Sequence, residues 1–169
     1  MQRNFISVRI RRACCAVAIT WCLTLGSHNA LASDAPKVAS GLDFVVGTWT
    51  GTSTCVGNRP ACKNETVVYR FVPLDGHPNQ VRLYADKIID GKRVPMGALV
   101  FEVDEHRGTL RGEFTRGQTQ GEWSFAVIGK TMTGKLVILP ERSVGRDVKA
   151  RRPTGAEVPA APPVSDYDN

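Results

Sequence analysis

Short segments in which apolar and polar residues alternate, separated by turn signals, run through residues 43–152. In "TVVYRFV" (66–72), for example, Val67, Tyr69 and Phe71 fall on one face of an extended chain. Alternation with a period of two indicates antiparallel strands with one apolar face and one wet face. No part of this region sustains the period of an amphipathic helix. The pattern therefore limits residues 43–152 to an all-β fold.

Turn signals divide this region into eight segments, and the strongest is "DG" at 90–91, which suits a type I′ hairpin with positive φ. Consecutive hairpins favour a meander, and closing the meander removes both unpaired edges. We therefore predict a single eight-stranded antiparallel up-and-down barrel over 43–152, with a two-sheet sandwich as the alternative. The interior of such a barrel is either just filled by side chains or open to one small ligand.

The two ends of the chain are expected to lie outside this domain. Residues 1–32 begin with the basic "MQRNFISVRIRR" and continue with the apolar "ACCAVAITWCLTLG", which is shorter than the roughly 20 residues of a membrane span. Because Ala30 and Ala32 form a small-residue cleavage site, we predict a signal peptide, with a retained anchor as the alternative. Residues 33–42 are predicted to be a linker, and the Pro/Ala-rich 153–169 a disordered tail.

Removal of a signal peptide changes the charge and the cysteine content. Four of the 22 basic residues and none of the 16 acidic ones precede residue 33, so 18 basic residues face 16 acidic ones and nucleic-acid binding gains no support. Only Cys55 and Cys62 then remain, and in an exported chain such a pair predicts one disulfide. A metal site is the rival interpretation, and it needs more ligands than these. The predicted location is the periplasm or the exterior, without a stable membrane anchor.

The stretch "VGTWTG" (46–51) places a tryptophan among glycines at the start of the first segment. In a closed barrel the last strand pairs with the first, so Trp49 faces the end of the last segment. Arg152 has the parity of Val148 and Ala150 and is expected to point inward. A guanidinium over the indole contributes roughly 0.5–2 kcal/mol. Trp49 and Arg152 are therefore predicted to close one end of the barrel.

The "GTW" at 47–49 and the basic residues at 151–152 resemble those of small bacterial lipocalin-like, calycin-type barrels. The resemblance covers the architecture of 43–152 rather than an aligned stretch. Two features of the usual lipocalin are not evident in this sequence: a helix packed on the barrel and a second motif in a mid-barrel turn. The resemblance implies either binding of an apolar small molecule or contact with a protein, and fold analogy does not choose between them.

The inward face of the predicted barrel is rich in aromatic and aliphatic side chains, which either pack as a core or line a cavity. Small inward positions such as Gly112 and Gly134 would make room for a ligand, and Tyr69 and Ser53 are the inward polar candidates. The predicted ligand-binding residues are Trp49, Tyr69, Phe71, Leu83, Phe101, Phe114, Trp123, Phe125, Met132 and Leu136.

Signs of catalytic chemistry are weak. The "GTSTC" at 51–55 lies inside a predicted strand, whereas a nucleophile elbow needs a strand-to-helix turn. The "DEHRG" at 104–108 is interpreted as a solvated hairpin tip, although its carboxylates and His106 are also the basis of an enzyme hypothesis. We therefore predict no catalytic residues, no metal and no cofactor, and a protein that is not an enzyme.

Two functions follow from these observations. The first is an exported lipocalin-like barrel that binds a small apolar or amphipathic molecule in its interior. The alternative is a protein-binding or inhibitory barrel with a filled core that acts through its loops. The loop 55–62, with Arg59 at its tip, is the candidate contact for such a partner.

Overall fold

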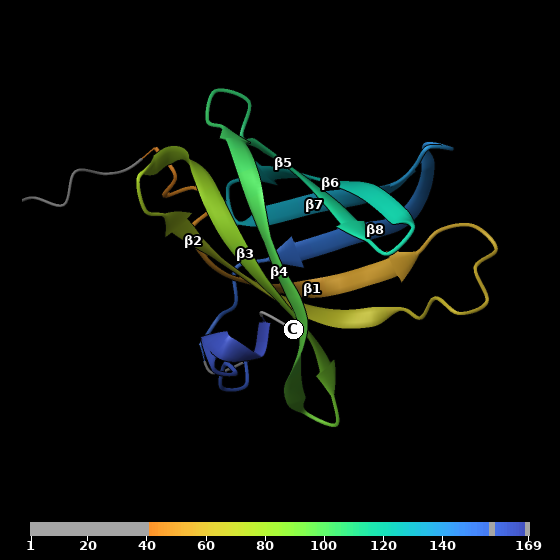
Figure 1. Cartoon of the computed structure of the whole chain (residues 1–169). Coiled ribbons are helices and arrows are strands. Elements are labelled where there is room, and N and C mark those ends of the chain that lie inside the picture. Colours follow the sequence, from red (N-terminus) through yellow and green to blue (C-terminus); the bar gives the residue numbers. More distant parts are fainter. Residues whose placement is uncertain (1–40, 156–157, 168–169) are drawn as a thin grey trace, which may run out of the picture. The chain divides into compact units, whose positions relative to one another are not determined.

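The computed structural model describes residues 41–155 and 158–167. Eight antiparallel strands follow one another in sequence order and close into a barrel, as Figure 1 shows. The strands are β1 (Gly47–Cys55), β2 (Glu65–Leu74), β3 (His77–Ile89), β4 (Lys92–Asp104), β5 (Thr109–Arg116), β6 (Thr119–Ile128), β7 (Thr131–Leu139) and β8 (Ser143–Arg151). The predicted up-and-down barrel is thus confirmed, and the sandwich alternative is wrong.

The barrel closes where its first and last strands meet. β1 pairs antiparallel with β8, from Thr50 opposite Arg151 to Cys55 opposite Arg146. At Gly51 the strands approach so closely that a Cβ atom would lie 2.0 Å from the carbonyl oxygen of Lys149. Glycine is therefore required at this point of the seam, since no side chain fits between the two backbones.

Alternation along the strands separates a buried inner face from an outer face. Trp49, Phe71 and Phe101 are fully buried, and each is followed and preceded by more exposed or smaller neighbours. β3 and β4 form the longest hairpin, and its turn residues Asp90 and Gly91 have φ of 50° and 72°. This confirms the positive φ expected for the "DG" turn.

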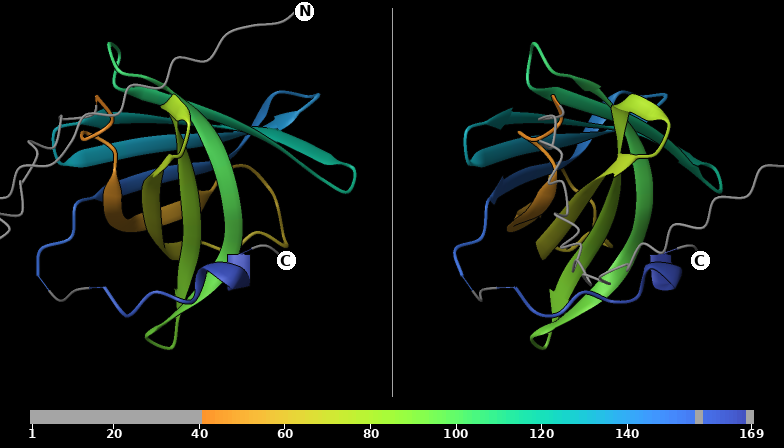
Figure 2. Two further views of the ribbon diagram at one scale, coloured as in Figure 1. Left: turned by 60° about the vertical axis from the view of Figure 1, so that its left-hand side comes forward. Right: turned by 90° about the vertical axis from the view of Figure 1, so that its left-hand side faces the viewer.

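The chain beyond β8 differs from the disordered tail expected over 153–169. A 3₁₀ helix covers Val164–Tyr167, and the side chain of Tyr167 is buried. Figure 2 shows this short helix beside β3 and β4, near the hairpin that joins them. The physical reason is that a tyrosine can bury its ring when its hydroxyl finds an acceptor, and Tyr167 finds Asp86.

Other expected segments lie mostly beyond the described residues. The signal peptide (1–32) and most of the linker (33–42) fall within residues 1–40, which are not described, and they stay predictions. Leu42, at the end of that linker, is buried in the core, so the packed region begins slightly before residue 43.

Within 41–155 and 158–167, no helix is long and apolar enough to cross a membrane. Over the same residues, no three histidine, cysteine, aspartate or glutamate side chains are grouped so that they could hold a metal ion.

Candidate binding site

The predicted lining residues all belong to the inner face, but they differ in exposure. Phe114 and Trp123 are half-buried. The other eight are buried, namely Trp49, Tyr69, Phe71, Leu83, Phe101, Phe125, Met132 and Leu136. The structure therefore brings these side chains together, and it leaves two of the aromatic ones in contact with solvent.

Aromatic rings fill the middle of the barrel around Phe125. The ring centroid of Phe125 lies 5.7 Å from that of Tyr69, 6.0 Å from that of Phe71 and 5.5 Å from that of Phe101. Trp123 stacks on Phe125 at 5.7 Å, with 3° between the ring planes. Such pairs are worth about 0.5–1.5 kcal/mol each beyond their area burial, so this cluster forms a packed core.

The inward glycines were expected to make room for a ligand, and the structure gives two of them another role. A Cβ atom at Gly134 would lie 2.4 Å from the ring of Phe125, and one at Gly112 would lie 3.0 Å from the ring of Phe101. The rings thus rest directly on the backbone of neighbouring strands. The space that these glycines leave is already occupied by the aromatic core.

One end of the barrel, which we call the Trp49 end, is closed. The guanidinium of Arg152 lies 4.0 Å from the centroid of the Trp49 ring, and Arg152 Nη2 donates to the carbonyl oxygen of Phe44 at 3.0 Å. Trp49 Nε1 donates to the carbonyl oxygen of Val45 at 2.8 Å. Burial lowers the pKa of Arg152 from its ordinary value. A Cβ atom at Gly47, whose φ is +110°, would lie 2.7 Å from Arg152 Nη1.

The opposite end carries a second inward arginine, and we call it the Arg146 end. Arg146 Nη1 donates to Ser53 Oγ at 3.0 Å and pairs with Glu65 Oε2 at 3.1 Å. Its Nη2 donates to the carbonyl oxygen of Lys63 at 3.2 Å. The side chains of Arg146 and Glu65 are 19% and 20% exposed, so this ion pair is accessible to a small solute.

Tyr69 joins this polar group from the side of the aromatic core. Burial raises the pKa of its phenol above the ordinary value, while a hydrogen bond with Ser53 acts in the opposite direction. The phenol therefore stays neutral and keeps its proton for hydrogen bonding. Ser53 and Tyr69 are the inward polar residues expected from the sequence, and the structure places them beside Arg146.

Arg146 itself was missed by the sequence analysis, although a signal for it existed. It has the same parity on β8 as Val148 and Ala150, which predicts an inward side chain. In the strand register Arg146 pairs with Leu136, and Leu136 pairs with Trp123. An indole, an aliphatic side chain and a guanidinium thus lie in one row across β6, β7 and β8.

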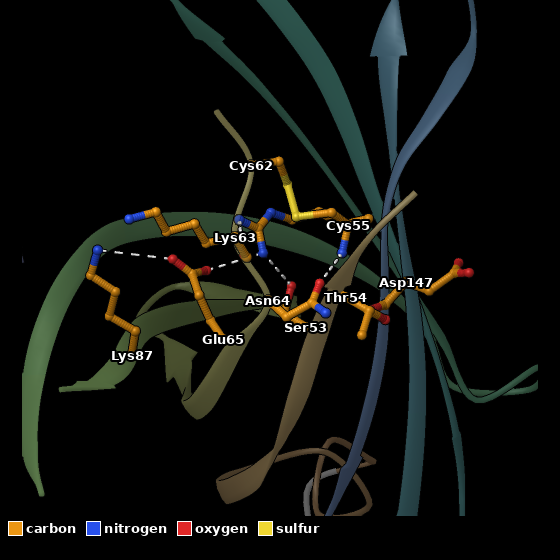
Figure 3. The surroundings of a disulfide bond; sticks show 10 residues. Ser53, Thr54, Cys55, Cys62, Lys63, Asn64, Glu65, Lys87 and Asp147 are labelled. Atoms are coloured by element: carbon orange, nitrogen blue, oxygen red, sulfur yellow. Dashed lines mark hydrogen bonds and ion pairs between the residues drawn. A yellow bond between two sulfur atoms is a disulfide. The ribbon is translucent and has the colours of Figure 1, made fainter. Parts of the chain in front are cut away.

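The loop that precedes β2 braces the Arg146 end. The predicted disulfide between Cys55 and Cys62 is present, with Cα atoms 6.0 Å apart. Asn64 Oδ1 accepts the backbone N–H of Cys55 at 2.8 Å, as Figure 3 shows together with Ser53 and Glu65. Arg59 Nη2 donates to Ser143 Oγ at 2.8 Å. Arg59, expected as a contact for a partner, is therefore bonded to the start of β8.

One hollow is lined by residues of β4 to β8, including the core residues Phe125 and Val148. It measures about 820 Å³, and its lining includes outward-facing charges such as Arg111, Lys135 and Asp147. These charges pair along the sheet, Arg111 with Glu122 at 3.4 Å and Lys135 with Asp147 at 3.8 Å. The two charges of an exposed ion pair are well solvated, and they attract each other only weakly. The Arg146 end, where polar groups are partly desolvated beside aromatic rings, is the better candidate.

Comparisons with known proteins find similarity to solved structures. No family model matches the sequence, and no curated protein matches it. The structure is similar to that of the S-type phycobiliprotein lyase CPES from Guillardia theta, with 12% sequence identity, a TM-score of 0.39, and coverage of 66% of this chain and 90% of that chain. That protein is named a lyase, and the prediction that this chain is not an enzyme is withdrawn.

Proposed function

We propose that this chain is an exported, lipocalin-like barrel that binds a small amphipathic anion at the Arg146 end. The apolar part of the ligand lies against Trp123 and Leu136, and its anionic group meets the guanidinium of Arg146. The observation that carries the proposal is the row in which these three residues neighbour one another on adjacent strands, all facing inward.

The charge of the ligand follows from the state of Arg146. Its guanidinium has donors in a planar fork that suits a carboxylate, sulfonate or phosphate. Glu65 already forms an ion pair with one nitrogen of this guanidinium, Nη1. Lys87, 3.8 Å from Glu65, adds a second positive charge to the group, so the three side chains together carry a net positive charge. An anion is therefore favoured over a cation at this end.

The site for the apolar part is limited by the packed centre. Phe125 and the rings around it occupy the middle of the barrel, so the ligand rests on top of this core rather than passing through it. Trp123 is half-buried and offers a flat apolar face at the boundary. This places the ligand closer to solvent than the interior site expected from the sequence.

Export is the second part of the proposal. Disulfides persist in oxidising compartments and are rare in the cytosol, and the Cys55–Cys62 bond therefore supports the predicted signal peptide. The expected location is the periplasm or the exterior. Mass spectrometry of the protein recovered from culture would show whether the chain begins after Ala32.

Fluorescence titration with two matched probes tests the binding site. Anilinonaphthalene sulfonate carries an anionic group, and N-phenylnaphthylamine has the same kind of aromatic rings without it. The double variant Arg146→Met, Glu65→Gln keeps this end free of an unpaired carboxylate. We expect this double variant to lower the affinity for the sulfonate probe at least about tenfold, which corresponds to about 1.4 kcal/mol. The affinity for the neutral probe should stay nearly unchanged.

The control is Lys149→Met, since Lys149 is an exposed residue on the outer face of the same strand. It should leave the affinity for both probes unchanged. Equal losses for the two probes, or an equal loss in Lys149→Met, would show that the anion is not recognised by Arg146. Quenching of Trp123 fluorescence by the bound probe would show that the probe lies beside this residue. The Trp123→Phe variant identifies which part of the fluorescence comes from Trp123.

A second candidate function is favoured by the aromatic core. A barrel whose centre is packed can act through its loops, and loop 55–62 is fixed at both ends by the disulfide and by Arg59. Such a loop loses little entropy on binding a protein partner. Retention of a partner from a periplasmic extract by the wild type, but not by Asn58→Lys at the exposed part of this loop, would favour it.

A further inference from the structure

The outer face of β2–β4 carries a group of charged and aromatic side chains that is buried, although it points away from the barrel interior. We call Arg70, Tyr84, Asp86 and Arg93 the Asp86 cluster. The side chains of Asp86 and Arg93 are 0% and 4% exposed, and Tyr84 is buried as well. Outward charges on a sheet are normally solvated, so this burial needs an explanation.

Tyr167 from the C-terminal segment is a direct part of that explanation. Its hydroxyl donates to Asp86 Oδ1 at 2.6 Å. Its ring meets that of Tyr84 edge to face, with centroids 5.0 Å apart and 70° between the planes. Arg93 binds the other carboxylate oxygen, with Nε 2.8 Å from Asp86 Oδ2. One carboxylate oxygen of Asp86 thus accepts hydrogen bonds from an arginine of the barrel, and the other accepts a hydrogen bond from the phenol of the tail.

Arg70 gives the Asp86 cluster an unused capacity for an anion. Its guanidinium lies over the ring of Tyr84 at 4.7 Å. Its Nε and Nη2 atoms are buried and have no hydrogen-bond partner. Buried donors without an acceptor are costly, and a carboxylate is the acceptor that a guanidinium fits best. The cluster is therefore suited to a phenol with an acidic group close to it.

Among the tail residues that the structure describes, 153–155 and 158–167, one side chain is buried. In the 3₁₀ helix Val164–Tyr167, only Tyr167 is buried, while Val164, Ser165 and Asp166 are exposed. Between β8 and this helix the chain contains Pro153, Pro159, Pro162 and Pro163, and each proline fixes its own φ. Because Tyr167 alone is buried among these described residues, we expect that the segment can be displaced.

We propose that the Asp86 cluster is a binding site for a tyrosine beside acidic residues in a partner protein, and that the C-terminal segment of this chain occupies it as a tethered competitor. The hydroxyl acceptor Asp86, the ring partner Tyr84 and the unpaired donors of Arg70 each recognise one part of that ligand. The tail itself, "VSDYDN" at 164–169, shows the same combination of tyrosine and aspartates. This site is independent of the one at the Arg146 end.

The experiment measures binding of a fluorescent peptide with the sequence of residues 158–169 to the full chain by anisotropy. In the variant Tyr167→Ala the tethered side chain is gone, so the peptide should bind in its place. In the wild type the tail competes, and the affinity should be at least about tenfold lower. Ser165→Ala, a change at an exposed neighbour in the same helix, should behave like the wild type.

The hydroxyl is tested through the peptide rather than through the protein, because a change at Asp86 would also leave Arg93 buried without its partner. A peptide with phenylalanine in place of tyrosine should bind Tyr167→Ala at least about tenfold more weakly. Failure of the tyrosine peptide to bind a Tyr167→Ala protein with an unaltered circular dichroism spectrum would overturn the proposal. Equal affinity for the wild type and Tyr167→Ala would overturn it too, since the tail would then not compete.

Discussion

The two ends of the barrel each receive an arginine from β8, and the two arginines behave differently. Arg152 lies over the Trp49 ring and donates to a backbone carbonyl. Arg146 is bonded to a hydroxyl, a carboxylate and a carbonyl, and its side chain stays partly exposed. The same residue type on the same face of one strand thus closes one end and provides a polar group at the other. The partner side chains, rather than the arginine, decide which role results.

The largest effect that separates the two ends is expected for their tryptophans. Trp49→Ala removes a fully buried ring and should lower the free energy of unfolding by about 3–5 kcal/mol. Trp123→Ala should cost less than half as much, because Trp123 is half-buried. Urea unfolding followed by circular dichroism measures both. Equal losses would remove the distinction between a structural end and an accessible one.

Next in size is the disulfide, which belongs to the Arg146 end. Replacing Cys55 and Cys62 together by serine opens a loop of about eight residues and should cost about 2.5 kcal/mol by the chain-entropy estimate. Hydrogen exchange should become faster in residues 56–64. The amides around Trp49 should keep their protection, because the bridge does not touch that end. Faster exchange at both ends would show that they are coupled.

The arginine of the closed end provides a smaller effect. Arg152→Met removes the contact with the indole, which is worth roughly 0.5–2 kcal/mol, and should leave the affinity for the anionic probe unchanged. The same replacement at Arg146 should reduce that affinity. Thermal unfolding and probe titration, carried out on both variants with Lys149→Met as the control, give a direct comparison. A loss of probe affinity in Arg152→Met would mean that the ligand reaches the closed end.

The smallest effect concerns the C-terminal segment, which is held beside β3 and β4 on the outer face. Burial and the hydrogen bond to Asp86 raise the pKa of Tyr167 to about 12, against an effect of Arg93 and Arg70 in the opposite direction. Because the pKa is higher when the tyrosine is docked, docking is fully stabilised below about pH 10 and is lost as the pH rises towards 12. Tyrosinate absorbance at alkaline pH, compared with that of Tyr167→Phe, would show this late titration.

Much of the barrel was predictable from local pattern alone. Alternation fixed which residues of each strand face inward, and the "DG" turn at 90–91 fixed the longest hairpin. The disulfide followed from there being only two cysteines left after the predicted cleavage. Strand alternation and the turn depend on residues that are neighbours in the sequence, and two cysteines allow only one pairing. These features can therefore be predicted from the sequence alone.

The contacts that give the candidate sites their chemistry were not predictable in the same way. Arg146 had the right parity, but its partner Glu65 lies on another strand. The rings that rest on Gly112 and Gly134 depend on which strands become neighbours and on the rotamers of Phe101 and Phe125. Tyr167 lies in a segment whose composition is typical of disorder, and only the position of Asp86 in the folded barrel explains its burial.

The pairing of β1 with β8 has a consequence for the order of events during folding. These two strands lie at opposite ends of the barrel sequence. Contacts between distant parts of a chain form late, since the loop between them must first be closed at an entropic cost. The cylinder therefore remains open until synthesis has reached its last strand. A chain that ended before Ser143 would therefore leave one edge of β1 and one edge of β7 without a neighbouring strand.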